Sequence, residues 1–314
     1  MTIPFTCPHC GTQTDVFEQY AGLSGPCAVC GKQVTVPYVP SATPVPAATP
    51  AAGVAIPSTA RRQGGSLALI VVVVFGGLLA ATAIAVFLIA LVFPAVSAYR
   101  AASHKTACAS NLQAIALAIQ KYEAEHGSLP PAYVADASGK PLHSWRVLIL
   151  PYLGSGYDHI YRRYDFNQPW DGPNNRQLFS TIPAEYVCPA DPDARAKRET
   201  NYMVAVGKRT MFPREKSAAR TSLRDGVQDT LLLVETPATG VCWLEPRDLD
   251  ADQMLFKING KVGVEIGSAH PGGAHVCTVD GQTHFLTDSA PPDALQAMTT
   301  IDGGETVPWY LVEE

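Results

Sequence analysis

Four cysteines near the start of the chain have the type and spacing of metal ligands. Cys7 and Cys10 form one C-x2-C pair, Cys27 and Cys30 form a second, and sixteen residues separate the two pairs. Each pair places two thiolates on one tight turn, so two turns supply the two edges of a tetrahedral ion. A glycine follows each pair, where the chain must fold back towards the sulfurs. The pattern predicts a structural Zn²⁺ site with every position filled, with two disulfides or an iron site as alternatives.

The segment around these cysteines has few large apolar residues, among them Phe5, Val16, Phe17, Leu23 and Val34. A core this small needs an additional cross-link to remain folded, so the metal is expected to supply most of the stability of this segment. Residues 1–37 resemble a zinc ribbon. That resemblance implies a structural or interaction module, and His9, between two ligands, is expected to be solvated.

An uninterrupted apolar run extends from Ser66 to Phe93 and contains no charged residue, no Asn or Gln and no Pro. As an α-helix the run would be about 42 Å long, which exceeds the ~30 Å of bilayer hydrocarbon. A helix satisfies its own backbone groups in lipid, so residues 66–93 predict one transmembrane helix. The run is too long, and too far from the first residue, for a cleaved signal peptide.

Charge and composition around this run suggest an orientation. Residues 38–65 are rich in Pro, Ala, Thr and Val and predict an extended linker. Arg61 and Arg62 lie closer to the run than Arg100 and Lys105 on its other side, which favours a cytoplasmic head. Zinc thiolates also persist in a reducing compartment. We therefore expect a single-pass membrane protein with a cytoplasmic head and an extracytoplasmic body.

Beyond the run, the sequence predicts an α+β body. Leu112, Ile115, Ile119 and Tyr122 recur at helical spacing, so a second helical length is expected to bury one stripe and to end at Gly127. Pro94 is expected to kink or interrupt the helix. Strands are expected at 200–207, 230–235, 261–267 and 275–286, with a short helix at 144–153. The plan is a long N-terminal helix packed on an antiparallel sheet, as in a type IV pilin or pseudopilin.

The body also contains several sequence blocks in a fixed order: FPAVSAYRAA, CASNLQAIALAIQKYEAEHGSLPPAY, SWRVLILPYL, YDFNQPWDGPNN, YVCPADPDA, TNYMVAVG, LRDGVQDTLLLVE, VCWLEPRDL and HPGGAHVCTVDGQTHFL. In the last block nine residues separate His270 from Asp280-Gly281. Over about residues 91–287 the chain resembles the bacterial DUF1559 proteins, which are prepilin-like proteins with a C-terminal H-x9-DG motif. The resemblance implies a pilin-like domain over residues 94–290.

One part of the family pattern is missing. Prepilin-like proteins usually have a short basic leader and a Glu a few residues into the apolar run, and residues 66–93 contain no Glu. Prepilin processing and filament assembly are therefore not expected, and we expect a permanently anchored relative. Residues 291–314 contain five acidic residues and no Lys or Arg, and are expected to form a solvated tail.

The H-x9-DG motif has two explanations. Asp280-Gly281 is typical of a type I′ hairpin turn, and His270 would then hydrogen-bond across to the hairpin, a structural role that we favour. Alternatively His270, His275 and Asp280, with His284 nearby, form the metal or acid–base site of a metal-dependent hydrolase.

Four further cysteines are spread through the body. Cys108, on the second helical length, and Cys188, before a proline, are expected to form a disulfide if the body lies in an oxidising compartment. Two separate buried thiols are the alternative. Cys242 and Cys277 lie in strand-like contexts and are expected to be apolar fillers, with further pairing as the alternative.

Bulk properties exclude some functions. The net charge is −5 and no basic block is present, which argues against a nucleic-acid partner. No phosphate-binding loop or nucleophile elbow occurs, so no catalytic residue is assigned and no small-molecule substrate is evident. We expect a non-enzymatic, membrane-anchored structural or interaction protein, with the lipid bilayer and an unidentified protein as partners. A pseudopilin-type subunit of a secretion or fibre system, and the hydrolase above, are the alternatives.

Overall fold

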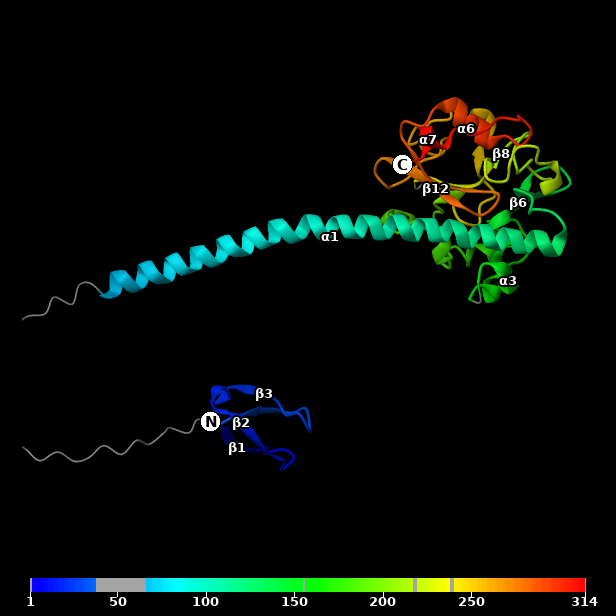
Figure 1. Ribbon diagram of the computed structural model, residues 1–314. Coiled ribbons are helices and arrows are strands. Elements are labelled where there is room, and N and C mark those ends of the chain that lie inside the picture. Colours follow the sequence, from blue (N-terminus) through cyan, green and yellow to red (C-terminus); the bar gives the residue numbers. More distant parts are fainter. Residues whose placement is uncertain (1, 38–65, 155, 217–218, 238–239, 314) are drawn as a thin grey trace, which may run out of the picture. The chain divides into compact units, whose positions relative to one another are not determined.

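The computed structural model describes residues 2–37, 66–154, 156–216, 219–237 and 240–313 (Figure 1). The chain divides into two compact units, Met1–Val72 and Val73–Glu314. We call residues 2–37 the head and the folded part of the second unit the body. The linker predicted at residues 38–65 lies outside the described residues.

The head consists of two antiparallel hairpins. Strand β1 (Thr2–Thr6) pairs with β2 (Gln13–Phe17), and β3 (Ser24–Pro26) pairs with β4 (Gln33–Thr35). A short 3-10 helix, Glu18–Tyr20, lies between the hairpins. Each C-x2-C pair occupies the turn of one hairpin. Among the described residues of the head only Cys7 and Val36 are buried, so the hairpins have almost no core of their own.

Helix α1 (Ser66–His126) is continuous over 61 residues and contains Pro94 in its interior. Pro94 was expected to kink or interrupt the helix, and of these two effects the interruption is wrong because the helix is continuous. The proline removes a single backbone donor, and the flanking residues are mostly Ala, Leu, Val and Phe, which keep the helix intact where no water competes for its backbone. The predicted end is confirmed, since the Gly127 N–H donates to the Glu123 carbonyl at 2.7 Å.

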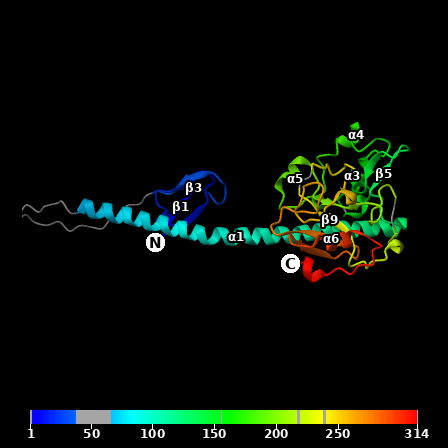
Figure 2. The same ribbon diagram turned by 90° about the horizontal axis from the view of Figure 1, so that it is seen from above.

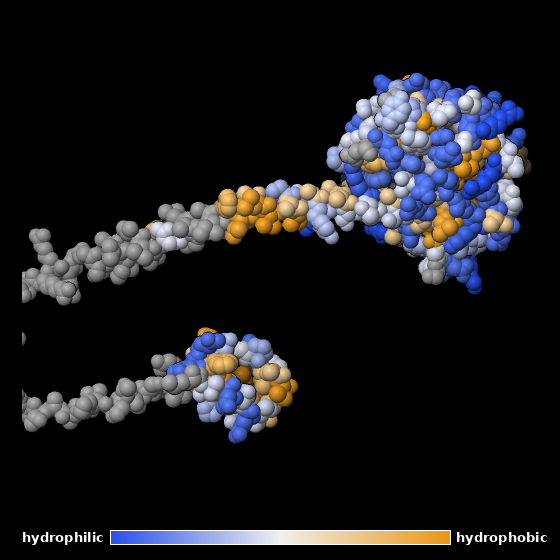
Figure 3. Space-filling view, in the orientation of Figure 1, coloured by the Kyte–Doolittle hydropathy of each residue, from blue (hydrophilic) through white to orange (hydrophobic). Residues whose placement is uncertain are grey.

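The first half of α1 has the character of a membrane anchor. Within the described part of the chain, α1 is the one helix long and apolar enough to cross a bilayer. From Val86 to Phe93 its large apolar side chains are all more than half exposed, and Figure 3 shows them as an orange band on the helix. Large apolar side chains that no described residue covers are expected to contact lipid rather than water. This supports a single-pass membrane protein.

The body is built on a four-stranded antiparallel sheet in the order β12-β11-β9-β7. The strands are β7 (Tyr202–Met203), β9 (Leu231–Glu235), β11 (Gly273–Thr278) and β12 (Thr283–Thr287). The strands predicted at 230–235 and 275–286 are thus confirmed, and the α+β class with them. The stretch 200–207 forms β7 and the short β8 (Ala205–Val206), which pairs in parallel with β10 (Leu249–Asp250). A further hairpin joins β5 (Tyr133–Ala135) and β6 (Pro141–Ser144).

The strand predicted at 261–267 is wrong, because those residues form turns. Their apolar alternation resembles that of a strand, but the buried carboxylate of Glu265 accepts the Lys257 N–H at 3.1 Å and also the Leu255 N–H. Within the segment itself, the Val264 and Glu265 N–H groups donate to the Lys261 carbonyl at 3.1 and 3.0 Å. Local turn hydrogen bonds therefore take donors that a strand partner would otherwise take.

Both faces of the sheet are covered. Leu112, Ile115 and Ile119 of α1 are fully buried in one cluster with Cys277 of β11, as the helical spacing predicted. Contacts of α1 with the β11–β12 hairpin, such as Gln113 Nε2 to Thr283 Oγ1 at 3.4 Å, place the helix along this hairpin. In Figures 1 and 2 the second half of α1 runs along the body.

The opposite face is covered by the segment that we expected to be a solvated tail. Helix α6 (Pro292–Thr299) buries Leu295 and Met298 in a second cluster with Val234 of β9 and Val276 of β11. A final turn, α7 (Trp309–Val312), follows. The acidic residues of 291–314 are solvated, but the apolar positions between them complete the core. For this reason β9 and β11 are buried along their whole length.

Short helices connect the remaining elements. The helix expected at 144–153 is present as α2 (Trp145–Leu148), capped by the Ser144 side chain and followed by a 3-10 turn at Leu150–Tyr152. Arg146 of α2 is fully buried and its guanidinium pairs with Asp248 at 2.6 Å, which connects α2 to the loop before β10. The others are α3 (Asp158–Arg163), α4 (Pro173–Arg176) and α5 (Pro192–Lys197), with 3-10 turns at Ala184–Tyr186, Arg220–Ser222 and Ala251–Gln253.

Candidate functional site

The structure brings the four cysteines of the head together. Sγ of Cys7 lies 3.9 Å from Sγ of Cys30, and Sγ of Cys10 lies 3.9 Å from Sγ of Cys27. All four sulfurs lie within 4.8 Å of one another. A tetrahedral ion with metal–sulfur bonds of about 2.3 Å holds its sulfurs about 3.8 Å apart. The four side chains therefore fit a metal ion, and each close pair takes one sulfur from each hairpin.

Local backbone geometry shapes both turns in the same way. Gly11 and Gly31 have φ values of 73° and 70°, a left-handed conformation that favours glycine. Their N–H groups donate to the carbonyls of Cys7 and Cys27 at 2.9 and 2.8 Å. The glycines thus fold the chain back after each cysteine pair, as the sequence predicted.

The pKa values of Cys10, Cys27 and Cys30 are shifted in different directions. Hydrogen bonds from the side chain and backbone of Thr12 lower the pKa of Cys10 to about 6. Backbone hydrogen bonds of Cys30 and Val29 lower the pKa of Cys27. These shifts favour the thiolate, the form that binds a metal, at Cys10 and Cys27. Against a backbone hydrogen bond of Lys32, burial and the neighbouring thiols raise the pKa of Cys30 to about 11. Several adjacent thiolates repel one another, so a bound cation would stabilise the group.

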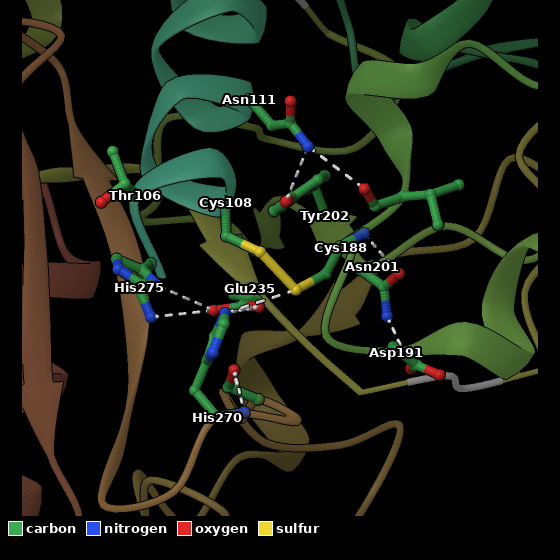
Figure 4. Close-up of a disulfide and its surroundings, with 12 residues drawn as sticks. Thr106, Cys108, Asn111, Cys188, Asp191, Asn201, Tyr202, Glu235, His270 and His275 are labelled. Atoms are coloured by element: carbon green, nitrogen blue, oxygen red, sulfur yellow. Dashed lines mark hydrogen bonds and ion pairs between the residues drawn. A yellow bond between two sulfur atoms is a disulfide. The ribbon is translucent and has the colours of Figure 1, made fainter. Parts of the chain in front are cut away.

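In the body, a second group of donors surrounds a disulfide (Figure 4). Cys108 of α1 and Cys188 are bonded, with their Cα atoms 5.5 Å apart. Beside them lie Glu235, at the end of β9, His270, in the loop before β11, and His275 of β11. We call these five residues the Glu235 cluster. All are nearly or fully inaccessible to solvent.

The carboxylate of Glu235 is the centre of this cluster. Its Oε2 accepts the backbone N–H of His275 at 3.1 Å and lies 3.1 Å from Nδ1 of the same residue. Its Oε1 accepts no hydrogen bond, and Nε2 of His270 lies 3.7 Å from it. The same Nε2 lies 3.4 Å from Sγ of Cys188. Burial lowers the pKa of His270, although the nearby Glu235 carboxylate opposes the shift. The lowered pKa favours a neutral imidazole, the form that binds metals.

Asp280, the other half of the H-x9-DG motif, is not part of the cluster. The six-residue strand β11, about 20 Å long, lies between His270 and Asp280. The carboxylate of Asp280 instead accepts the Thr278 hydroxyl at 2.6 Å and the Gln282 N–H at 3.0 Å, within the hairpin turn. His284 is also apart, stacked on Trp309. The three residues of the hydrolase alternative therefore do not form one site.

The turn itself differs from the predicted type I′. Type I′ needs positive φ at both central residues, but Asp280 has no positive φ, whereas Gly281 has φ of 91°. The Gly281 N–H donates to the Thr278 carbonyl at 2.9 Å, and the Thr278 N–H donates to the Gln282 carbonyl at 3.0 Å. This is a three-residue loop with a glycine bulge. Asp280-Gly281 is a hairpin signal in either case, and the turn role favoured for Asp280 holds.

We expected His270 to hydrogen-bond across to the hairpin turn, and this prediction is wrong. It contacts the cluster around Glu235 at the other end of β11. The motif thus marks the two ends of one buried strand. A family model described as a protein of unknown function (DUF1559) matches residues 97–246 and 246–293, most of the chain.

The chain belongs to the DUF1559 family. The match includes every member of the Glu235 cluster and the packed half of α1, whereas the four-cysteine head lies outside it. No curated protein and no solved structure matches the chain. The family resemblance inferred from the series of sequence blocks is confirmed.

Sequence reasoning missed Glu235. It closes the apolar run TLLLVE, where a charged residue usually marks the solvated end of a strand. The signal that could have found it is the histidine spacing, since His270 and His275 bracket the start of the neighbouring strand. Of the two remaining cysteines, Cys277 is fully buried and Cys242 is half-buried, and neither forms a disulfide in the described residues.

Proposed function

We propose that this protein is a membrane-anchored, non-enzymatic structural or interaction protein, with a zinc ribbon in the cytoplasm and a DUF1559 body outside it. The observation that carries the proposal is the double use of α1. One uninterrupted helix exposes large apolar side chains in its first half and buries a stripe of the body core in its second. An anchor that is also a core element positions the body at the membrane.

The metal of the head is proposed to be Zn²⁺ with a structural role. Four thiolates at tetrahedral spacing form a closed set of soft ligands, which suits Zn²⁺ and leaves no position for a catalytic water. The nearly absent core of the head supports the same role, since metal binding would then supply the folding free energy.

The orientation is proposed from redox chemistry. The body contains a disulfide, which persists in an oxidising compartment, whereas four ligand thiols need a reducing one. The two arginines before the apolar run favour the same orientation. A cytoplasmic head and an extracytoplasmic body satisfy both requirements.

The head is proposed to bind a protein. Phe17, Leu23 and Val29 are each more than half exposed in a module that has almost no core to bury them. A hollow of about 510 Å³ lies among the apolar residues of the two hairpins, including Val16, Leu23 and Val34. Exposed apolar patches of this kind mark interaction surfaces.

Protease accessibility in sealed membranes tests the proposal. In right-side-out vesicles an added protease should cleave the body and spare the head, and in inverted vesicles the pattern should reverse. Labelling with a membrane-impermeant thiol reagent and metal analysis of the purified chain complete the test. Cleavage of both parts from the same side would contradict the topology, and a metal-free head would contradict the zinc ribbon.

A pseudopilin-type subunit is the second candidate, because α1 lies along an antiparallel hairpin in the way a pilin helix lies on its sheet. Intact-mass measurement separates the candidates. A chain that retains the ribbon supports the anchored protein, and a chain truncated before the apolar run supports the pseudopilin.

A further inference from the structure

The Glu235 cluster contains a polar atom that its own partners leave unsatisfied. Oε1 of Glu235 is buried and accepts no hydrogen bond, although the carboxylate is fully inaccessible to solvent. A buried oxygen without a hydrogen-bond donor raises the free energy of the folded state, because its hydrogen bonds to water are lost and not replaced. It faces Nε2 of His270 and, beyond it, the sulfur of Cys188 (Figure 4).

Distances within the cluster match those of a tetrahedral metal site. The Nε2 of His270 lies 3.4 Å from Sγ of Cys188 and 3.7 Å from Oε1 of Glu235. Ligand bonds of about 2.0–2.3 Å place neighbouring ligand atoms about 3.3–3.8 Å apart. The four donor atoms, including Sγ of Cys108, lie within 4.8 Å of one another. In this state the two sulfurs are bonded to each other.

Loss of the disulfide changes the chemistry of the cluster. Two thiols would lie beside a carboxylate and an imidazole in a volume closed to water, and deprotonated thiols there need a cation. His275 already binds Oε2 of Glu235 through its backbone N–H and Nδ1, so it can orient the carboxylate while Oε1 remains available.

We propose that reduction of the Cys108–Cys188 disulfide converts the Glu235 cluster into a Zn²⁺ site, with Cys108, Cys188, His270 and Glu235 as ligands and His275 as a positioning residue. The site has two mutually exclusive states, a disulfide or a bound ion. It is separate from the four-cysteine site of the head and does not depend on the function proposed above.

Reduction breaks the sulfur–sulfur bond with two electrons and adds two protons. A phosphine supplies the two electrons and becomes a phosphine oxide, while one water molecule supplies the oxide oxygen and both protons. A dithiol supplies both electrons and both protons and becomes a disulfide. Zn²⁺ then replaces the two thiol protons, which leave to solvent, and the neutral imidazole and the carboxylate complete the coordination.

The test uses the full-length chain in detergent, with the four head cysteines changed to Ser so that only the body binds metal. Bound Zn²⁺ is counted after equilibration with buffered Zn²⁺ and removal of the free ion. We expect no bound ion in the oxidised chain and one ion per chain after reduction by a phosphine. His270→Ala and Glu235→Gln should each weaken binding at least about tenfold, whereas His284→Ala, on β12 outside the cluster, should not.

Reduction could unfold the body, so a second measurement accompanies the first. The near-ultraviolet circular dichroism of the buried Trp145 and Trp243 reports packing. If reduction without metal removes this signal, Zn²⁺ should restore it in the parent chain and not in Cys188→Ser. The proposal is overturned if Zn²⁺ neither binds the reduced chain nor restores the signal. It is equally overturned if binding persists unchanged in Cys188→Ser or His270→Ala, since Cys242 and Cys277 would then be the ligands.

Discussion

The head and the body each gather four potential metal ligands, but the two groups stand in opposite relations to their folds. In the head the cysteines lie in the turns of two small hairpins whose described residues bury only Cys7 and Val36. In the body the Glu235 cluster lies inside a core that a sheet and two covering helices form around it. A metal bound at the first site would stabilise a small fold, whereas the residues of the second site are positioned by a fold that is already packed. Substitutions should therefore have very different effects in the two regions.

The largest expected effect is in the head. Cys27→Ser removes one of four ligands, and the head should unfold, because structural zinc supplies about 10–16 kcal/mol in comparable peptides. Metal content and proteolysis of residues 2–37 measure the loss, while the thermal transition of the body should not change. His9→Ala is the matched control and should retain metal. A head that stays protease-resistant without metal would show that the head, like the body, folds without help from a metal ion.

In the body, removing the disulfide should cost less. Cys108→Ser combined with Cys188→Ser opens a link between residues 80 apart, which is worth about 4 kcal/mol in the chain-entropy model. Denaturant unfolding followed by tryptophan fluorescence measures it. Cys242→Ser, at a half-buried free thiol, should cost less than about 1 kcal/mol. Equal losses of unfolding free energy for the two changes would show that the disulfide does not stabilise the body.

Packing on α1 should produce a similar or slightly smaller effect. Ile115 is fully buried, so Ile115→Ala should destabilise the body by about 3 kcal/mol through lost burial and a cavity. Leu117, two residues further on the same helix, is half exposed, and Leu117→Ala should change stability by less than about 0.5 kcal/mol. Similar values at both positions would contradict the packing of α1 against the sheet.

The hairpin turn should respond weakly. Asp280→Ala removes the acceptor of the Thr278 hydroxyl and the Gln282 N–H, with an expected cost of about 1 kcal/mol. Asp280→Asn retains a side-chain acceptor and should cost less. A much larger loss, or an effect on zinc binding by the reduced body, would mean that Asp280 does more than shape the turn.

The smallest expected effect is a pH dependence in the body. Burial lowers the pKa of His143, whose Nδ1 lies 2.8 Å from the Tyr164 hydroxyl. The unfolded chain then binds a proton more readily than the folded one, so stability is greatest above the ordinary histidine pKa of about 6.5 and falls as the pH drops through the lower folded value. The decline between pH 8 and pH 5 should be shallower in His143→Asn. An equal decline in both chains would assign it to other groups.

Local patterns in the sequence predicted much of the fold. The helical stripe of Leu112, Ile115 and Ile119, the strand at 230–235 and the hairpin at 275–286 each follow from periodicity or turn chemistry within a few residues. The cysteine spacing of the head is equally local, and the two ligand turns form as expected. These features needed no knowledge of what lies across the core.

Features that depend on distant partners were missed. Glu235 is buried because a loop more than thirty residues later brings His270 over it, and nothing near residue 235 indicates this. The acidic composition of 291–314 concealed Leu295 and Met298, which close the second face of the sheet. At 261–267 the apolar alternation predicted a strand, but no described strand pairs with these residues, and hydrogen bonds to the Lys261 carbonyl form a turn instead.

The bond between Cys108 and Cys188 has a mechanical consequence. Cys108 lies on the same unbroken helix as the membrane-facing side chains, only fifteen residues after Phe93. A force that pulls on the lipid-embedded end of α1 would reach the body through a covalent bond as well as through side-chain contacts. The helix would then resist extraction under tension even where its packing alone would yield, and a reducing agent would abolish that resistance.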